Sequence, residues 1–249
     1  MNAQDNHKSW IPAKWDAPPG IKAGISTRKG GYSQTPFDEF NLALHVGDND
    51  TNVIQNRHQL KKYLNLKLEP VWLNQVHKNR IINTGPNQDT VADGIISDTP
   101  EVPCVILTAD CAPLLMCNAQ GNKIGAIHVG WRGLVSGIIE NAIHQFDTSS
   151  KDILVWIGPH IRDRYYEVGR DVFDACVSLD KDLKNGFTTK DPNHWYANLE
   201  VMINIILNKQ GIYQIFNTPY CTYKDQDLFY SYRRDSDTGR MASMIWLAE

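Results

Sequence analysis

The 249-residue sequence lacks the features that mark several specialised classes of protein. No apolar run approaches the ~18 residues of a membrane-spanning helix, and the start MNAQDNHKSWIPAKW has neither the basic residues nor the apolar core of a signal peptide. We therefore expect a cytoplasmic protein. The formal net charge of -3 gives no overall electrostatic reason to predict nucleic acid or a membrane surface as a partner.

The five cysteines and eight histidines form no local metal-binding pattern. No two cysteines make a CxxC pair, which argues against a disulfide framework and a zinc ribbon. No two histidines make the His-x-His pair that is common in multicopper centres. Any metal site must therefore be assembled from residues that lie far apart in the sequence. No internal repeat or low-complexity linker divides the chain, so residues 1–249 are expected to form one domain.

Strand and helix patterns are mixed along the chain. Short apolar or alternating segments predict strands at 21–26, 70–77, 92–97, 102–110, 123–130, 153–158, 213–219 and 240–248. Apolar residues at helical spacing predict helices over 50–64, with Asp50 or Thr51 as N-cap, and over 134–146, 171–179 and 199–210. This order favours an α+β or mixed α/β layered fold over a purely doubly wound sheet.

Three possible metal ligands stand at the ends of predicted strands: His77, Cys111 and His128. Imidazole and thiolate both suit zinc, and three protein ligands leave a fourth position open for water or substrate, as in catalytic zinc sites. Copper is the other metal that such ligands can take. The separations of 34 and 17 residues match no local motif, so a buried structural cysteine and hydrogen-bonded histidines remain open alternatives.

Several longer motifs make the chain similar to the YfiH-type family, whose members are described as laccase-domain or multicopper polyphenol oxidase proteins. The resemblance runs from about Gly24 to the C-terminus. It is carried by STRKGGYS, FNLALHVGDN, NQVH, ADGIIS, LTADCAPLL, IHVGWRG, IGPHI, YYEVG and FYSYRRDSDTGRMASMIWL. The chain departs from the family in HIRDRY, residues 160–165, where family members often carry small residues and cysteine.

The resemblance implies an α+β fold, an α/β/β/α sandwich with mixed sheets, related to bacterial toxin deamidases. It also implies a zinc ion held by His77, Cys111 and His128. The implied activity is phosphorolysis of purine nucleosides (adenosine, inosine, guanosine and methylthioadenosine) together with deamination of adenosine. Purine nucleosides and phosphate are accordingly the expected small-molecule partners, and the oligomeric state is not predicted.

Phosphorolysis requires a site for a phosphate dianion, and deamination requires an activated water with a nearby proton carrier. Arg28 and Arg132 lie at strand-to-turn junctions and are candidates for the phosphate site. Asn41 and His45 are candidates for contacts with ribose or base. Asp110 next to Cys111 is the candidate proton carrier, with Asp93 of the ADG turn as the alternative. The cluster Arg233, Arg234 and Arg240 is interpreted as mainly structural, although it could extend the anion site.

Three rival functions follow from the same residues. Cys111 could be a nucleophile, activated by His128 or His77, that acts on an amide or a cell-wall precursor. A copper-dependent polyphenol oxidase ranks lower, because eight histidines without a His-x-His pair do not suffice for a type 1 copper and a trinuclear cluster. A non-catalytic binding module would tolerate loss of Cys111 without any phenotype.

Overall fold

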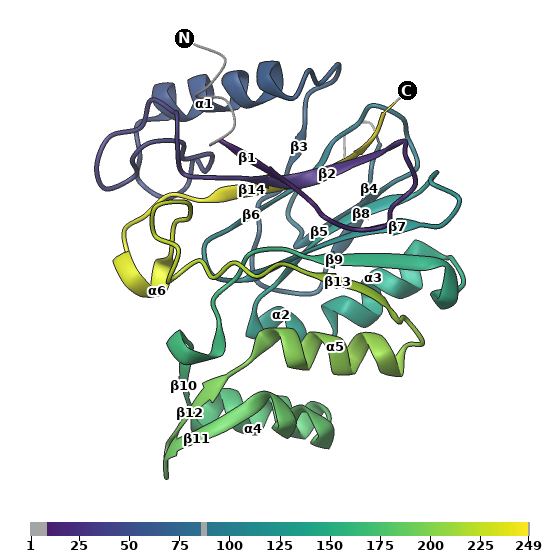
Figure 1. The fold of residues 1–249 in the computed structure, drawn as a ribbon, viewed down its shortest axis with the longest axis vertical. Coiled ribbons are helices and arrows are strands. Elements are labelled where there is room, and N and C mark those ends of the chain that lie inside the picture. The colour runs from purple at the N-terminus through teal and green to yellow at the C-terminus, as the bar shows by residue number, and fades with distance from the viewer. Residues whose placement is uncertain (1–8, 86–88, 249) are drawn as a thin grey trace.

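Two large β-sheets lie face to face between layers of helices in the computed structural model, which describes residues 9–85 and 89–248 (Figure 1). In spatial order, the five-stranded sheet contains β1 (Trp10–Pro12), β2 (Ile21–Ser26), β14 (Met241–Leu247), β6 (Cys104–Thr108) and β3 (Val71–Trp72). The six-stranded sheet contains β13 (Gln214–Asn217), β9 (Ile153–Ile157), β7 (Ala112–Asn118), β8 (Ile124–Val129), β5 (Gly94–Ser97) and β4 (Ile81–Asn83). Both sheets are mixed, with one parallel pair in the first and two in the second.

The two sheets bury apolar side chains against each other. Ile106 and Ile245 of the five-stranded sheet belong to the same core cluster as Leu115 and Trp156 of the six-stranded sheet. Strands that are buried on both faces read as continuous apolar runs, which explains sequences such as ILVWI and MASMIWL.

Helices cover the outer face of each sheet (Figure 1). On the five-stranded sheet, α1 (Asp50–Tyr63) contributes Leu60 to a cluster with Val105 and Trp246. On the six-stranded sheet, a second cluster combines strand residues with α2 (Trp131–Val135), α3 (Ile138–Phe146), α4 (Arg170–Leu179) and α5 (Leu199–Lys209). The predicted α+β class, with α/β/β/α layers and mixed sheets, is confirmed.

The remaining elements are short. A three-stranded antiparallel sheet of β10 (Glu167–Gly169), β12 (His194–Ala197) and β11 (Phe187–Asp191) lies beside α4 (Figure 1). The one-turn helix α6 (Tyr232–Asp235) precedes β14, and 3-10 turns occupy Ser150–Asp152, Asp163–Tyr165 and Lys181–Gly186. None of the helices in the described residues is long and apolar enough to cross a membrane.

Three local predictions were wrong in detail. The helix predicted over 134–146 is two helices, because Gly137 has a φ of 78° that interrupts α2 and α3. Of the strand predicted over 70–77, only Val71–Trp72 forms a regular strand. His77 lies in a turn, with a φ of 58°. The N-cap of α1 is Asn49, whose side chain accepts hydrogen bonds from the amides of Thr51 and Asn52, rather than Asp50 or Thr51.

The TADC segment lies where the chain passes from one sheet to the other. β6 ends at Thr108 in the five-stranded sheet and β7 begins at Ala112 in the six-stranded sheet. Asp110, between them, has a φ of 95°, a backbone angle that residues other than glycine rarely adopt. The polar interruption between two apolar runs is therefore the crossover between the sheets, and it brings Cys111 to their common edge.

Candidate functional site

The structure brings together the three candidate ligands, which lie 34 and 17 residues apart in the sequence. One ligand atom each from His77, Cys111 and His128 lies within 4.8 Å of the other two. The rings of His77 and His128 meet edge to face with 4.7 Å between centroids. Within residues 9–85 and 89–248, no other group of three or more His, Cys, Asp or Glu side chains forms such a cluster. The arrangement could hold a single metal ion.

A buried carboxylate orients both histidines. Oδ1 of Asp93 lies 2.9 Å from Nδ1 of His128, and Asp93 is fully buried. When Nδ1 donates to a carboxylate, Nε2 carries the lone pair and is free to bind a metal. Burial raises the pKa of Asp93, but hydrogen bonds from His128 and from the amides of Lys78 and His77 outweigh burial and lower it. Asp93 is thus an anion that fixes the tautomer of His128.

The same carboxylate shapes the turn that carries His77. Asp93 accepts hydrogen bonds from three consecutive amides, those of Val76 (3.2 Å), His77 (2.9 Å) and Lys78 (2.8 Å). These bonds hold the chain in the turn where His77 has its positive φ. Asp93 is therefore a positioning group for two ligands, whereas the sequence suggested a proton carrier or an ordinary turn residue.

Cys111 has the electrostatic surroundings of a thiolate. Burial alone would raise the pKa of its thiol, but the charges of His128 and His77 and hydrogen bonds from both lower it to about 6. Burial lowers the pKa of His128, and the thiolate of Cys111 together with Asp93 raises it above its ordinary value. These surroundings favour the thiolate form of Cys111, so the sulfur is available as a metal ligand or nucleophile.

Gly130, which follows β8, has no side chain, and the space where its Cβ would lie is next to Cys111 and His77. A Cβ at this position would lie 2.8 Å from Sγ of Cys111 and 3.5 Å from Cδ2 of His77. Its φ of -91° and ψ of 170° are accessible to any residue. The requirement for glycine in the GWRG sequence is therefore close approach to the ligands and not backbone conformation.

A cavity of about 430 Å³ opens next to the ligand cluster. Its wall includes the three ligands and side chains from both sheets, the start of α2 and the segment before β14. Besides the ligands it is lined by His45, Gln75, Leu107, Thr108, Ala109, Asp110, Gly130, Trp131, Arg132, Ile161, Tyr166, Leu199, Tyr232, Arg233 and Arg240. A volume of this size, with aromatic and cationic groups, suits a small polar ligand that has an apolar ring.

Two of the predicted substrate contacts line this cavity. Arg132 is exposed, and its guanidinium lies 4.5 Å from the ring of Trp131. His45 is exposed, and partial burial together with the charges of Arg240, Arg57 and His77 lowers its pKa. His45 is therefore a neutral imidazole at neutral pH, able to donate one hydrogen bond and accept another.

Asp110 also lines the cavity, but its carboxylate is already occupied. Oδ1 accepts a hydrogen bond from Thr222 Oγ1 at 2.6 Å, and Oδ2 accepts from Ser231 Oγ at 3.0 Å and from the amide of Arg233 at 2.7 Å. These bonds connect the sheet crossover to the segment that precedes β14. The geometry suits Asp110 to orienting its neighbours better than to carrying a proton.

The structure does not bring Arg28 and Asn41 to the cavity wall. Nε of Arg28 donates to the carbonyl of Asp38 at 3.0 Å, and its guanidinium lies over the ring of Tyr230. Asn41 is fully buried, where its side chain bonds the backbone of Ala43 and the amide of Arg240. Both residues stabilise loops near the site without lining it.

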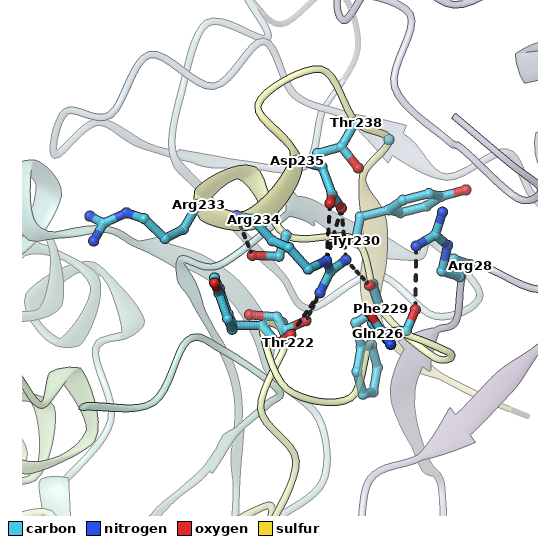
Figure 2. A network of polar contacts seen from close by, with 12 residues as sticks. Arg28, Thr222, Gln226, Phe229, Tyr230, Arg233, Arg234, Asp235 and Thr238 are labelled. Carbon is cyan, nitrogen blue, oxygen red and sulfur yellow. Dashed lines mark hydrogen bonds and ion pairs between the residues drawn. The ribbon is translucent and has the colours of Figure 1, made fainter. Parts of the chain in front are cut away.

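The three arginines of the SYRRDSDTGR segment have separate surroundings. Figure 2 shows the guanidinium of Arg234 enclosed by Asp235, Thr222 and Phe229, while the side chain of Arg233 extends away from this network. Arg233 and Arg240 line the cavity, and Arg234 does not. The structural interpretation of this cluster therefore holds for Arg234 only.

The segment 160–165, where the sequence departs from the family, contributes little to the cavity. Only Ile161 of these residues lines it. His160 is buried and bonds the carbonyl of Gly158 through Nδ1, and Arg162 is engaged by Glu200 and by the carbonyl of Thr218. The difference from the family sequence therefore affects residues that pack behind the cavity wall more than residues that line the cavity.

Gln75, Tyr166 and Tyr232 also line the cavity, although none of them was a candidate site residue from the sequence. The side chain of Gln75 makes two hydrogen bonds to the backbone of Leu107 in β6, as a neighbouring strand would. Tyr166 lies between a 3-10 turn and β10, and Tyr232 begins the one-turn helix α6; elements this short have no periodic pattern that marks a side chain as inward-facing. The available signal was membership of a family motif: NQVH contains Gln75, GWRG contains Trp131, YYEVG contains Tyr166 and SYRRDSDTGR contains Tyr232.

Comparison with known proteins shows the family to which the chain belongs. Residues 22–248 match the family described as multi-copper polyphenol oxidoreductase laccase. The chain belongs to this family. The chain is similar to the purine nucleoside phosphorylase YfiH of Escherichia coli, with 41% identity over 95% of this chain and 98% of that protein. A purine nucleoside phosphorylase of Pseudomonas aeruginosa is 38% identical over 97% of this chain and 99% of its own length.

Solved structures of YfiH-type proteins have the same fold. A protein of Neisseria meningitidis superimposes with a TM-score of 0.93 at 36% identity, covering 97% of this chain and 100% of that chain. YlmD of Geobacillus stearothermophilus superimposes with a TM-score of 0.88 at 28% identity, covering all of this chain and 98% of that one. Membership of the YfiH-type family, with relatives named purine nucleoside phosphorylases, supports an enzyme of that kind.

Proposed function

We propose that this protein is a zinc-dependent purine nucleoside phosphorylase that acts on adenosine, inosine, guanosine and methylthioadenosine and also deaminates adenosine. The observation that carries the proposal is the convergence of His77, Cys111 and His128 beside an arginine-lined cavity of about 430 Å³. The names of the relatives with 38% and 41% identity support the reaction class.

The residues of the cluster fit a zinc ion. Two imidazoles and one thiolate are typical zinc ligands, and three protein ligands leave a position open on the side of the cavity. Nε2 of His128 is directed to the cluster because Nδ1 is paired with Asp93. A bound zinc supplies a Lewis acid and lowers the pKa of water at its open position.

The chain's own groups meet the other requirements of the reaction. In phosphorolysis an oxygen of phosphate bonds to C1′ of the ribose, the bond from C1′ to the purine nitrogen breaks, and the proton of the phosphate passes to the purine. Cationic side chains in the cavity hold the phosphate, and the rings of Trp131 and Tyr166 offer apolar faces to the purine. His45, as a neutral imidazole, is suited to hydrogen-bonding the ribose hydroxyls or the base.

Copper-dependent oxidase chemistry is disfavoured by the ligand count. A multicopper centre requires several imidazole clusters, and one three-ligand cluster is found in the described part of the chain. His160 and His194 are bonded elsewhere, to Gly158 and Asp191.

One observation favours a second candidate, a hydrolase that uses Cys111 as its nucleophile on an amide or a cell-wall precursor. The carboxylate of Asp93 pairs with the imidazole of His128, and this imidazole in turn interacts with the thiol of Cys111. The same chain of contacts connects the acid, base and nucleophile of a catalytic triad. Zinc and nucleophile roles exclude each other at the same sulfur, so metal content decides between them.

The test is to purify the protein, measure its metal content, and incubate it with adenosine in the presence and absence of phosphate. We expect stoichiometric zinc, with ribose 1-phosphate and adenine formed only when phosphate is present and inosine formed in both conditions. Cys111→Ala serves as the control and should abolish both products. Absence of every product from zinc-loaded wild-type protein would reject the proposal.

A further inference from the structure

The segment from Ser231 to Arg240 forms one wall of the cavity and places two arginines on it. Arg234, between them in the sequence, donates to the carbonyls of Thr222, Tyr223 and Phe229 and to the carboxylate of Asp235. Arg234 therefore fixes the segment, and this leaves Arg233 and Arg240 as the members that can contact a ligand.

Arg240 is held at one end of its guanidinium. Nη1 donates to the carbonyls of Thr238 (2.7 Å) and Gly239 (2.9 Å), and the backbone amide donates to Oδ1 of the buried Asn41 (3.0 Å). Within residues 9–85 and 89–248, Nε and Nη2 have no hydrogen-bond partner. The side chain is thus anchored on the backbone while it retains donors in the cavity that it lines.

Arg233 is held in a similar way. Its amide donates to Asp110 at 2.7 Å, Nη1 donates to the carbonyl of Glu167 at 2.7 Å, and its guanidinium lies 5.2 Å from the ring centroid of Tyr166. Among the described residues, Nε and Nη2 again have no hydrogen-bond partner. In each of these two arginines, the backbone amide and Nη1 are held by hydrogen bonds. Nε and Nη2 have no such partner among the described residues, so they can donate to a ligand.

The charges along the cavity favour an anion at this wall. Asp110 is the one carboxylate in the described lining, and its oxygens are already occupied by three donors. Arg240 and the three possible ligands line the same cavity. An anion bound by these arginines would thus occupy the same cavity as the ligand cluster.

We infer that Arg233 and Arg240 form the oxyanion subsite of the cavity and that this subsite takes inorganic phosphate; the identity of the anion rests on the proposed phosphorolysis. Guanidinium groups bind phosphate oxygens through paired, charge-assisted hydrogen bonds, and anchored donors lose little entropy on binding. Arg132 is the rival, but it is exposed and its side chain makes no hydrogen bond within the described residues. Its guanidinium is therefore held by the contact with the ring of Trp131 and, among the described residues, by no hydrogen bond.

The inference gives Asp110 and Asn41 a shared role. Asp110 holds the backbone of Arg233, and Asn41 holds the backbone of Arg240. Both are positioning residues that act on the phosphate through an arginine.

The decisive experiment is phosphorolysis of inosine by Arg233→Ala, Arg240→Ala and Arg240→Lys proteins, with phosphate as the varied substrate. We expect the KM for phosphate to rise roughly tenfold or more in each alanine variant. The rise should be smaller in Arg240→Lys, because lysine keeps the positive charge but lacks the paired N–H donors of a guanidinium group. The KM for inosine should stay within about twofold of the wild-type value. Arg164→Ala, which removes an exposed arginine outside the cavity, is the matched control and should leave both constants unchanged.

A phosphate KM that is unchanged in both alanine variants would overturn the inference. If the wild-type protein shows no phosphorolysis at all, the proposed function fails, and binding alone tests the subsite. Phosphate should then raise the unfolding temperature of the wild-type protein above its value in potassium chloride of equal ionic strength. This shift should shrink in Arg240→Ala and persist in Arg164→Ala, and an equal shift in all three proteins would reject the subsite.

Discussion

Nδ1 of His128 lies 2.9 Å from Oδ1 of Asp93, and the same carboxylate binds the amides of the turn that carries His77. One buried side chain thus couples a ligand on a strand of the six-stranded sheet to a ligand in an irregular turn. The carboxylate of Asp93 holds both histidines in position through hydrogen bonds on the side away from the cluster, as is common for histidines that bind metals.

Asp93→Asn should weaken zinc binding about 10- to 100-fold, because an amide cannot accept from three backbone amides and from Nδ1 of His128 at once. The dissociation constant is measured by competition with a chromophoric chelator. Asp98→Asn, at an exposed position, is the control and should bind zinc as the wild type does. Equal affinities in both variants would show that Asp93 does not position the ligands.

Gly130→Ala should lower zinc affinity while leaving the metal-free fold close to its normal stability. The added Cβ would lie 2.8 Å from Sγ of Cys111, whereas the backbone angles of Gly130 suit alanine. Zinc titration and urea denaturation of the chelator-treated protein measure the two effects. Gly85→Ala is the control, because its Cβ would meet no atom of the described residues within 4 Å, its chain neighbours aside. A loss of stability without a loss of zinc affinity would contradict the assigned role.

Iodoacetamide should label Cys111 first in chelator-treated protein. Burial raises the pKa of its thiol, but the two histidines lower it to about 6, so the labelling rate should increase up to about pH 6 and level off above it. Burial raises the pKa of Cys117 to about 12 and of Cys176 to about 11, so these thiols should stay unlabelled in the folded protein. Peptide mass mapping identifies the modified residue.

Zinc should slow this labelling strongly, since a metal-bound thiolate is a poor nucleophile. Equal labelling rates with and without added zinc would favour the cysteine-nucleophile hydrolase over the zinc enzyme.

Arg234→Ala should lower the free energy of unfolding by about 2 kcal/mol, because it leaves the carbonyls of Thr222, Tyr223 and Phe229 without their donor. Its KM for phosphate should remain close to the wild-type value. Urea denaturation measures the first effect, with Arg164→Ala as the control. An unchanged stability together with a raised KM for phosphate would place Arg234 in the subsite instead.

Most of the regular structure could be predicted from the sequence. The apolar strands, such as 153–158 and 240–248, form as expected because strands buried on both faces carry an apolar side chain at almost every position. The prediction failed at Gly137, where a periodic apolar pattern continues across a break that only the backbone angle reveals. That residues 1–249 make up a single domain stays a prediction.

The order of amino acids already contains the residues whose chemistry suits the site: the three possible ligands, the nearby carboxylates and the arginines. Which of them meet depends on how the chain folds. His77, Cys111 and His128 converge because a turn, a crossover between sheets and a strand end share one edge, and such contacts leave no local pattern in the chain. The structure likewise separated Arg233 and Arg240 from Arg234, because the direction of a side chain in a one-turn helix or a loop depends on the hydrogen bonds available around it.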